Sequence, residues 1–75
     1  MEEMNNKQNI IRLCRRARRL LEMSQDALAK ESNFAQSRIS QFENGYYSGE
    51  IARYYYAHIM SESDRKIIDE IGGIL

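Results

Sequence analysis

Several of the residue types that favour β-strands are missing from this chain. Its 75 residues include no Val, Thr or Trp, and its Ile residues recur mostly at helical spacing. Leu, Arg, Ala, Met, Glu, Gln and Lys are abundant instead, and these residues lose least on entering a helix. A chain of this length builds a single small core. We therefore predict an all-α fold in which residues 1–75 form one domain.

Charge is balanced over the whole chain but is concentrated in one segment. The chain carries 11 basic and 11 acidic residues, so its formal net charge is zero. Six of the basic residues and no acidic residue lie between Lys7 and Arg19. A neutral protein can still present one basic face to an anionic partner. The alternative interpretation of this run is an ordinary solvated helix face.

Several classes of protein are disfavoured by what the sequence lacks. No apolar run approaches 18 residues, and the first residues do not resemble a signal peptide, so we expect a cytoplasmic protein with no membrane contact. One Cys excludes an internal disulfide framework, and one His leaves little for a metal site. The chain has no paired Cys/His arrangement and no glycine-rich phosphate loop. We therefore expect neither an enzyme nor a bound cofactor or metal.

Hydrophobic periodicity and capping residues predict five short helices. They cover about residues 7–22, 25–32, 36–43, 50–59 and 64–71. Ser24 is placed to cap the second helix, and Asn33 suits a left-handed backbone at its end. In the fourth helix, Ile51, Ile59 and either Tyr54 or Tyr55 are expected on one side. Residues 1–6 are expected to be loose.

The second and third predicted helices, with the short turn between them, have the proportions of a helix-turn-helix unit. At about 100° per residue, Ile39 and Phe42 point to the core, and the opposite face of the third helix carries uncharged donors and acceptors. Gln can pair bidentately with adenine, and Ser can donate or accept. A polar solvent face is the alternative. The residues that we expect to read base edges are Gln36, Ser37, Ser40 and Gln41.

A set of short motifs spans residues 18–45. In chain order they are Arg18, Ser24-Gln25, Leu28-Ala29, Asn33, Gln36-Ser37, Ile39 and Glu43-Asn44-Gly45. Together they resemble the phage-repressor/Cro family of helix-turn-helix proteins, also called the XRE family. The resemblance implies a five-helix lambda-repressor-like DNA-binding domain with the helix-turn-helix at helices 2 and 3. The chain departs from the family at Glu22 and Asn33, where Gly is common, and at Ala35, where Ser or Thr usually caps the recognition helix.

The resemblance also implies roles for residues outside the base-reading set. Arg18 would form a structural ion pair with Glu43. Gln25 would bond a phosphate and brace Gln36, and Asn44 with the loop after it would touch the DNA backbone. The expected phosphate contacts are Gln25, Asn44, Tyr46 and Tyr47 from the resemblance, with Arg15 and Arg16 added from the basic run.

Apolar residues left over near the C-terminus predict a dimer interface. Two-fold dimers of such domains read half-sites about 34 Å apart, so we expect a homodimer on an inverted-repeat operator. Residues 63–75, a helix and its tail, are the expected dimerisation element. The interface residues would be Ile67, Ile68, Ile71, Ile74 and Leu75.

The sequence thus predicts sequence-specific binding of double-stranded DNA by a small transcriptional regulator, acting as a repressor of a phage, plasmid or integrative element. The alternative is a protein-interaction module, or an antitoxin-type protein that binds a partner, retaining the fold. The zero net charge and the uncharged recognition face favour this alternative. The basic run and the joint presence of Gln25, Gln36 and Gln41 favour DNA binding.

Overall fold

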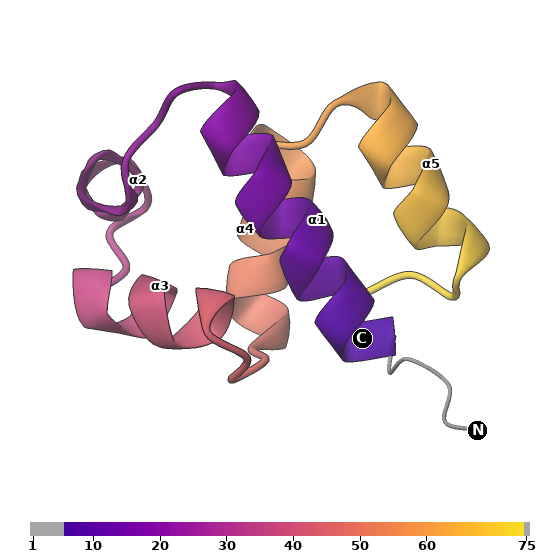
Figure 1. The fold of residues 1–75 in the computed structure, drawn as a ribbon, viewed down its shortest axis with the longest axis horizontal. Coiled ribbons are helices and arrows are strands. Elements are labelled where there is room, and N and C mark those ends of the chain that lie inside the picture. The colour runs from indigo at the N-terminus through magenta and orange to yellow at the C-terminus, as the bar shows by residue number, and fades with distance from the viewer. Residues whose placement is uncertain (1–5, 75) are drawn as a thin grey trace.

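The computed structural model describes residues 6–74, and within this range the chain forms five α-helices and no strand (Figure 1). They are α1 (Asn6–Leu20), α2 (Gln25–Ser32), α3 (Gln36–Glu43), α4 (Gly49–His58) and α5 (Glu62–Glu70). The prediction of an all-α, five-helix fold is confirmed, and each helix begins and ends within two residues of the expected position. Of the segment 1–6, only Asn6 lies inside the described residues, and it begins α1 rather than lying in a loose tail.

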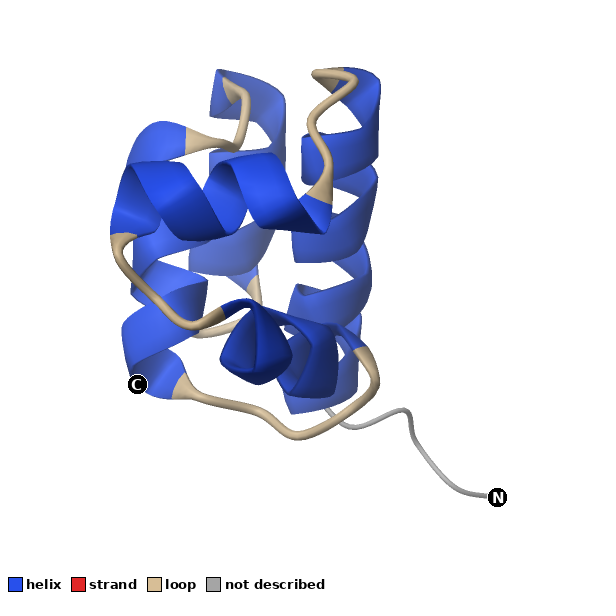
Figure 2. Cartoon of the chain, turned by 90° about the vertical axis from the view of Figure 1, so that its left-hand side faces the viewer, coloured by secondary structure: helices blue, strands red, loops and turns tan. Residues whose placement is uncertain are grey.

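The central element of the fold is α1, which packs against α3, α4 and α5. The α2–α3 pair lies at one end of the long axis, and α5 lies at the other (Figure 1). Seen from the α2–α3 end, one of these two helices crosses the view and the other points nearly toward the viewer (Figure 2). The helix-turn-helix unit is therefore presented at one end of the molecule, braced from behind by α1 and α4.

Apolar side chains from all five helices form one core. The core helps to fix the rotation of α3, because Ile39 and Phe42 are both fully buried. Phe42 stacks on Tyr55 of α4 with ring centroids 5.5 Å apart. Burying such a side chain contributes about 1.5–3 kcal/mol. The core residues are Ile10, Ile11, Cys14, Ala17, Leu28, Ile39, Phe42, Ile51, Ala52, Tyr55, Ile59, Met60 and Ile68.

Serine side chains cap α2, α4 and α5. Ser24, Ser48 and Ser61 each accept a hydrogen bond from the backbone N–H three residues later. This satisfies one of the amide groups that a helix start leaves without a partner. The recognition helix α3 follows Ala35, whose side chain makes no capping bond. Its start is therefore less well stabilised than the starts of these three helices.

The two turns around α2 require a left-handed backbone. Glu22 has φ 57° and Asn33 has φ 68°, the positions where the resembled family commonly has Gly. Asn tolerates this conformation better than most residues, whereas Glu has no special means of doing so. The backbone at Glu22 is nevertheless well bonded, since its N–H donates to the Arg19 carbonyl oxygen at 2.9 Å and the next N–H donates to Arg18 at 3.2 Å. The chain thus keeps the turn geometry without its usual glycines.

Candidate nucleic-acid interface

The outward face of α3 carries the residues expected to read bases. Gln36, Ser37 and Gln41 are exposed, and Ser40 is half-buried. They lie opposite the buried side of the helix, and Asn44, also exposed, follows its last turn. The structure therefore brings the four expected base-reading residues onto one helix, on the side that the core leaves open.

The buried carboxylate of Glu43 links α3 to side chains of α1, α2 and α4. Glu43, at the end of α3, is 3% exposed and accepts two bonds from Arg18, from Nε at 2.7 Å and from Nη2 at 2.8 Å. The Tyr55 hydroxyl donates to the same carboxylate, and Gln25 Nε2 donates to it at 3.1 Å. Burial alone would raise the pKa of Glu43, but the bonds from Arg18, Tyr55 and Gln25 together lower it. The structure thus places the expected partners Arg18 and Glu43 in direct contact. Tyr55 and Gln25 complete a buried cluster around the same carboxylate, which we call the Glu43 hub.

Gln25 braces a different part of α3 from the one expected. The sequence suggested a brace for Gln36 at the start of the helix, whereas the Gln25 amide donates to Glu43 at the end of it. An ionised carboxylate is a stronger acceptor than a neutral amide, which favours this choice. The Gln25 amide nitrogen carries two hydrogens, so the bond to Glu43 leaves one for a phosphate.

Tyr55 is the hub residue that the sequence did not single out. It is fully buried, whereas the Tyr54 hydroxyl donates to Glu31 at 3.4 Å and the Tyr56 hydroxyl donates to Asp69 at 2.8 Å, both at exposed positions. The available signal was helical spacing, because residue 55 lies four positions from both Ile51 and Ile59. What the spacing could not supply was the hydrogen-bond partner.

The two arginines expected to contact phosphate diverge. Arg15 Nη1 donates to the backbone oxygen of Glu43 at 3.2 Å, which places Arg15 beside the end of α3. Arg16 Nη2 donates to Asp64 Oδ1 at 2.9 Å, and the Asp64 side chain is only 2% exposed. Successive helix residues point about 100° apart, and α3 and α5 lie on different sides of α1 (Figure 1). The structure therefore does not bring Arg16 together with Arg15 at the end of α3, because the Arg16 side chain joins α1 to α5.

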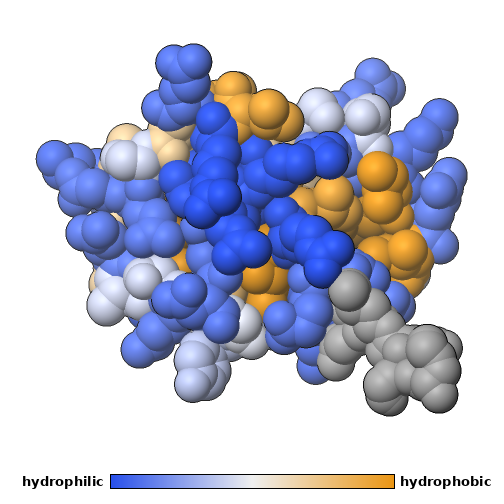
Figure 3. Space-filling view, viewed as in Figure 1, coloured by the Kyte–Doolittle hydropathy of each residue, from blue (hydrophilic) through white to orange (hydrophobic). Residues whose placement is uncertain are grey.

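A polar groove of about 240 Å³ runs between α1 and the end of α3. Residues 8, 12 and 15 fall on one face of α1, and Gln8 Nε2 donates to the Gly45 carbonyl oxygen at 3.2 Å. Strongly hydrophilic side chains gather over α1 in the centre of Figure 3. The sequence prediction did not include Gln8 or Arg12, although their helical spacing with Arg15 was visible. The groove is lined by Gln8, Ile11, Arg12, Arg15, Glu43 and Asn44.

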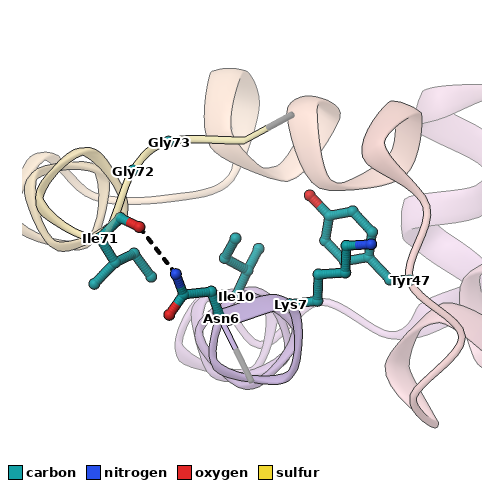
Figure 4. A pocket seen from close by; sticks show the side chains of 7 residues that line it. All are labelled: Asn6, Lys7, Ile10, Tyr47, Ile71, Gly72 and Gly73. Carbon is teal, nitrogen blue, oxygen red and sulfur yellow. Dashed lines mark hydrogen bonds between the residues drawn. The ribbon is translucent and has the colours of Figure 1, made fainter. Parts of the chain in front are cut away.

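The two loop tyrosines differ in accessibility. Tyr46 is 73% exposed, directly after the end of α3. Tyr47 packs on Phe42 at 6.1 Å between ring centroids, and Lys7 Nζ lies 5.5 Å from its ring centroid. Tyr47 also forms a wall of a pocket of about 260 Å³, at the other side of which the Asn6 amide donates to the Ile71 carbonyl oxygen, just after α5 (Figure 4). Of the two expected phosphate contacts, Tyr46 is therefore the accessible one.

The C-terminal isoleucines do not all face outward. Ile68 is fully buried, so its prediction as an interface residue is wrong because the core of its own chain covers it. Ile71 and Ile74 are half-buried against that core, and Ile67 is 42% exposed. Leu75 lies outside the described residues. A smaller patch remains, where Ile67 and Ile71 line a shallow groove with Asn9, Arg12 and Leu13 of α1.

Other kinds of site find little support in residues 6–74. Within this range no three His, Cys, Asp or Glu residues are grouped as metal ligands. None of the described helices is long and apolar enough to cross a membrane. Cys14 is buried, and burial together with the nearby charges of Glu43 and Asp64 raises the pKa of its thiol, which keeps it protonated.

Comparison with known proteins points to the same part of the chain. A family model described as helix-turn-helix, of the XRE class, matches residues 15–52, just over half of the chain. This range includes all of α2 and α3, the arginine of the buried pair and the first turn of α4. Neither the curated proteins nor the solved structures gave a match.

Proposed function

The chain belongs to the XRE, or phage-repressor/Cro-like, family of helix-turn-helix DNA-binding regulators, and we propose that it is a repressor that reads an inverted-repeat operator as a homodimer. The observation that carries the proposal is the open polar face of α3, held by the buried Glu43 hub. Bound at a promoter, such a domain would exclude the polymerase from the DNA that it covers. A phage, plasmid or integrative element is the proposed genetic context.

In this proposal, the uncharged side chains of α3 contact the base edges. Gln36 and Gln41 can each pair bidentately with adenine, and Ser37 and Ser40 can donate to or accept from either base of a pair. Such contacts carry sequence preference, whereas phosphate contacts carry affinity and orientation. The zero net charge of the chain is compatible with this division, because the basic residues are concentrated along α1.

Dimerisation is proposed through the patch of Leu13, Ile67 and Ile71, with residues 63–75 as the main contributing segment. Orange, apolar side chains gather on the α5 side of Figure 3. The α2–α3 pair lies at the opposite end of the molecule, so contact through α5 leaves both recognition helices facing outward (Figure 1).

The central test is a selection from random oligonucleotides at about 100 mM salt with the purified protein, followed by sequencing of the bound pool. We expect enrichment of an inverted repeat with half-sites about 10 base pairs apart, one turn of the DNA helix. Gln36→Ala should weaken binding by about 1–3 kcal/mol at one base pair and relax the preference there. Lys30→Ala, at an exposed position of α2, is the control and should leave the selected site unchanged. An unenriched pool from a folded sample would contradict the proposal.

The interface has a separate test. Ile67→Asp should yield a monomer in sedimentation and should weaken binding to the full inverted repeat more than binding to a half-site. Leu21→Asp places the same charge on another exposed apolar residue, at the α2 end of α1, and should leave the dimer intact. An unchanged sedimenting mass and DNA affinity for Ile67→Asp would show that this patch is not the interface.

A protein-interaction module, including an antitoxin-type protein, is the second candidate function. Leu20 is 70% exposed and Leu21 is 54% exposed, so the end of α1 offers an apolar surface without any contribution from α5. The selection experiment separates the two candidates, because a module that has lost DNA binding returns no enriched sequence.

A further inference from the structure

The polar groove between α1 and the end of α3 has the shape and position of a second contact to the DNA backbone. Its walls come from residues far apart in the chain, with Gln8 tied to Gly45 at 3.2 Å and Arg15 tied to the Glu43 backbone at 3.2 Å. These bonds fix the two helices relative to each other. The groove is therefore a formed surface rather than a row of independent side chains.

Two arginine side chains line the groove, and Glu43 also forms part of it. The Glu43 carboxylate is occupied by Arg18, Tyr55 and Gln25, which approach it within the core. What Arg15 contacts is the Glu43 backbone oxygen, and only one of its five N–H groups is needed for that bond. Arg12 adds a second guanidinium to the lining. Two planar, permanently charged donor groups on one wall match a phosphate group.

The groove is also continuous with the base-reading face. Asn44 lines it and directly follows α3, so the same residue borders both surfaces. When α3 lies in a major groove, the strand that borders that groove would pass the end of the helix. We propose that this groove binds a backbone phosphate of the DNA, with Arg12 and Gln8 as ligands beside Arg15 and Asn44. This proposal rests on the proposed function, and it extends the contact between protein and DNA beyond the bases that α3 reaches.

The test measures DNA affinity against salt concentration for the full chain and its Arg12→Ala variant. Loss of one phosphate contact should make the negative slope of log affinity against log salt shallower by about 0.9, which, relative to 1 M salt, corresponds to about eightfold weaker binding at 0.1 M salt. The loss should be the same on operator and on unrelated DNA, because a phosphate carries no sequence. Arg12 is exposed, so the variant should fold, and Gln8→Ala provides a second, uncharged probe. Because Arg12 also borders the patch of Leu13, Ile67 and Ile71, sedimentation of the variant must show an unchanged dimer.

Lys30→Ala is the control, since it removes one positive charge from an exposed position of α2 that lines no part of the groove. If Arg12→Ala and Gln8→Ala both behave like Lys30→Ala while the unmodified chain binds its operator, the groove proposal is wrong and the proposed function stands. If the unmodified chain itself shows no salt-dependent DNA binding, both fail.

A further arm distinguishes DNA phosphate from free phosphate. A duplex in which single phosphates are replaced in turn by neutral methylphosphonates should contain one position at which the Arg12→Ala penalty disappears. Inorganic phosphate is titrated into the free protein in parallel. Phosphate binding that depends on Arg12, combined with an Arg12→Ala penalty that no methylphosphonate removes, would assign the groove to a small anion and overturn the proposal.

Discussion

Replacing Tyr55 by Phe removes one hydroxyl from the core and leaves the aromatic ring in place. The ring is fully buried and stacks on Phe42, so a Phe side chain fills the same space. The missing hydroxyl is a donor to Glu43, which is 3% exposed and cannot recruit water in its place. The substitution therefore isolates one hydrogen bond to a buried charge.

The size of the effect follows from the bonds that remain. A hydrogen bond to a charged group contributes about 1.5–3 kcal/mol, and more when its loss leaves a buried group without any partner. Glu43 keeps two bonds from Arg18 and one from Gln25, so the loss should lie near the lower part of that range, about 2 kcal/mol. In a domain of this size, that corresponds to a fall in Tm of about 8–16 °C.

The assay is thermal and urea unfolding followed by circular dichroism, with Tyr54→Phe as the matched control. The Tyr54 hydroxyl donates to Glu31 at 3.4 Å in an exposed position, and its loss should cost less than about 0.5 kcal/mol. Equal losses for Tyr54→Phe and Tyr55→Phe would refute the argument that the Glu43 hub depends on a buried donor. A loss of no more than about 0.5 kcal/mol for Tyr55→Phe would do so too.

Three further predictions concern stability. The pKa of Glu43 is lower in the folded chain than its ordinary value of 4.5. Its contribution to the free energy of unfolding should therefore be fully present above pH 4.5 and should disappear as the pH falls through the folded pKa. Urea midpoints that stay level down to about pH 2 would contradict this. Ala35→Ser should supply the missing cap of α3 and raise the free energy of unfolding by about 0.5–2 kcal/mol, whereas Ala27→Ser, inside α2, should give no gain; equal thermal shifts for the two would contradict it. Glu22→Gly should relieve the left-handed backbone and gain about 1 kcal/mol in urea unfolding, and an equal gain from Glu22→Ala would attribute the effect to the lost charge instead.

Much of the recognition helix could be predicted from local sequence patterns. Its bounds and the direction of Ile39 and Phe42 followed from helical spacing, and its polar face followed as the opposite side. The left-handed residue at Asn33 was also predictable, since Asn adopts that conformation readily. These features depend on interactions within about four residues of the chain, which the sequence displays directly.

Local patterns do not distinguish neighbouring residues of the same type. Arg15 and Arg16 belong to the same basic run, yet one contacts the end of α3 and the other pairs with Asp64, 48 residues away. Ile67 and Ile68 are equally apolar, yet one is 42% exposed and the other is in the core. In each case the choice depends on which helix packs on which side of α1 or α5.

The sequence by itself therefore determined the helices, the Ser24 cap of α2 and the polar face that α3 turns outward, because those features arise from short-range geometry. The tertiary structure alone decided which donors join Arg18 around Glu43, which arginines border the groove at the end of α3, and which isoleucines remain for a partner. A buried carboxylate takes its donors from whichever helices packing brings to it, and this one draws on α1, α2 and α4.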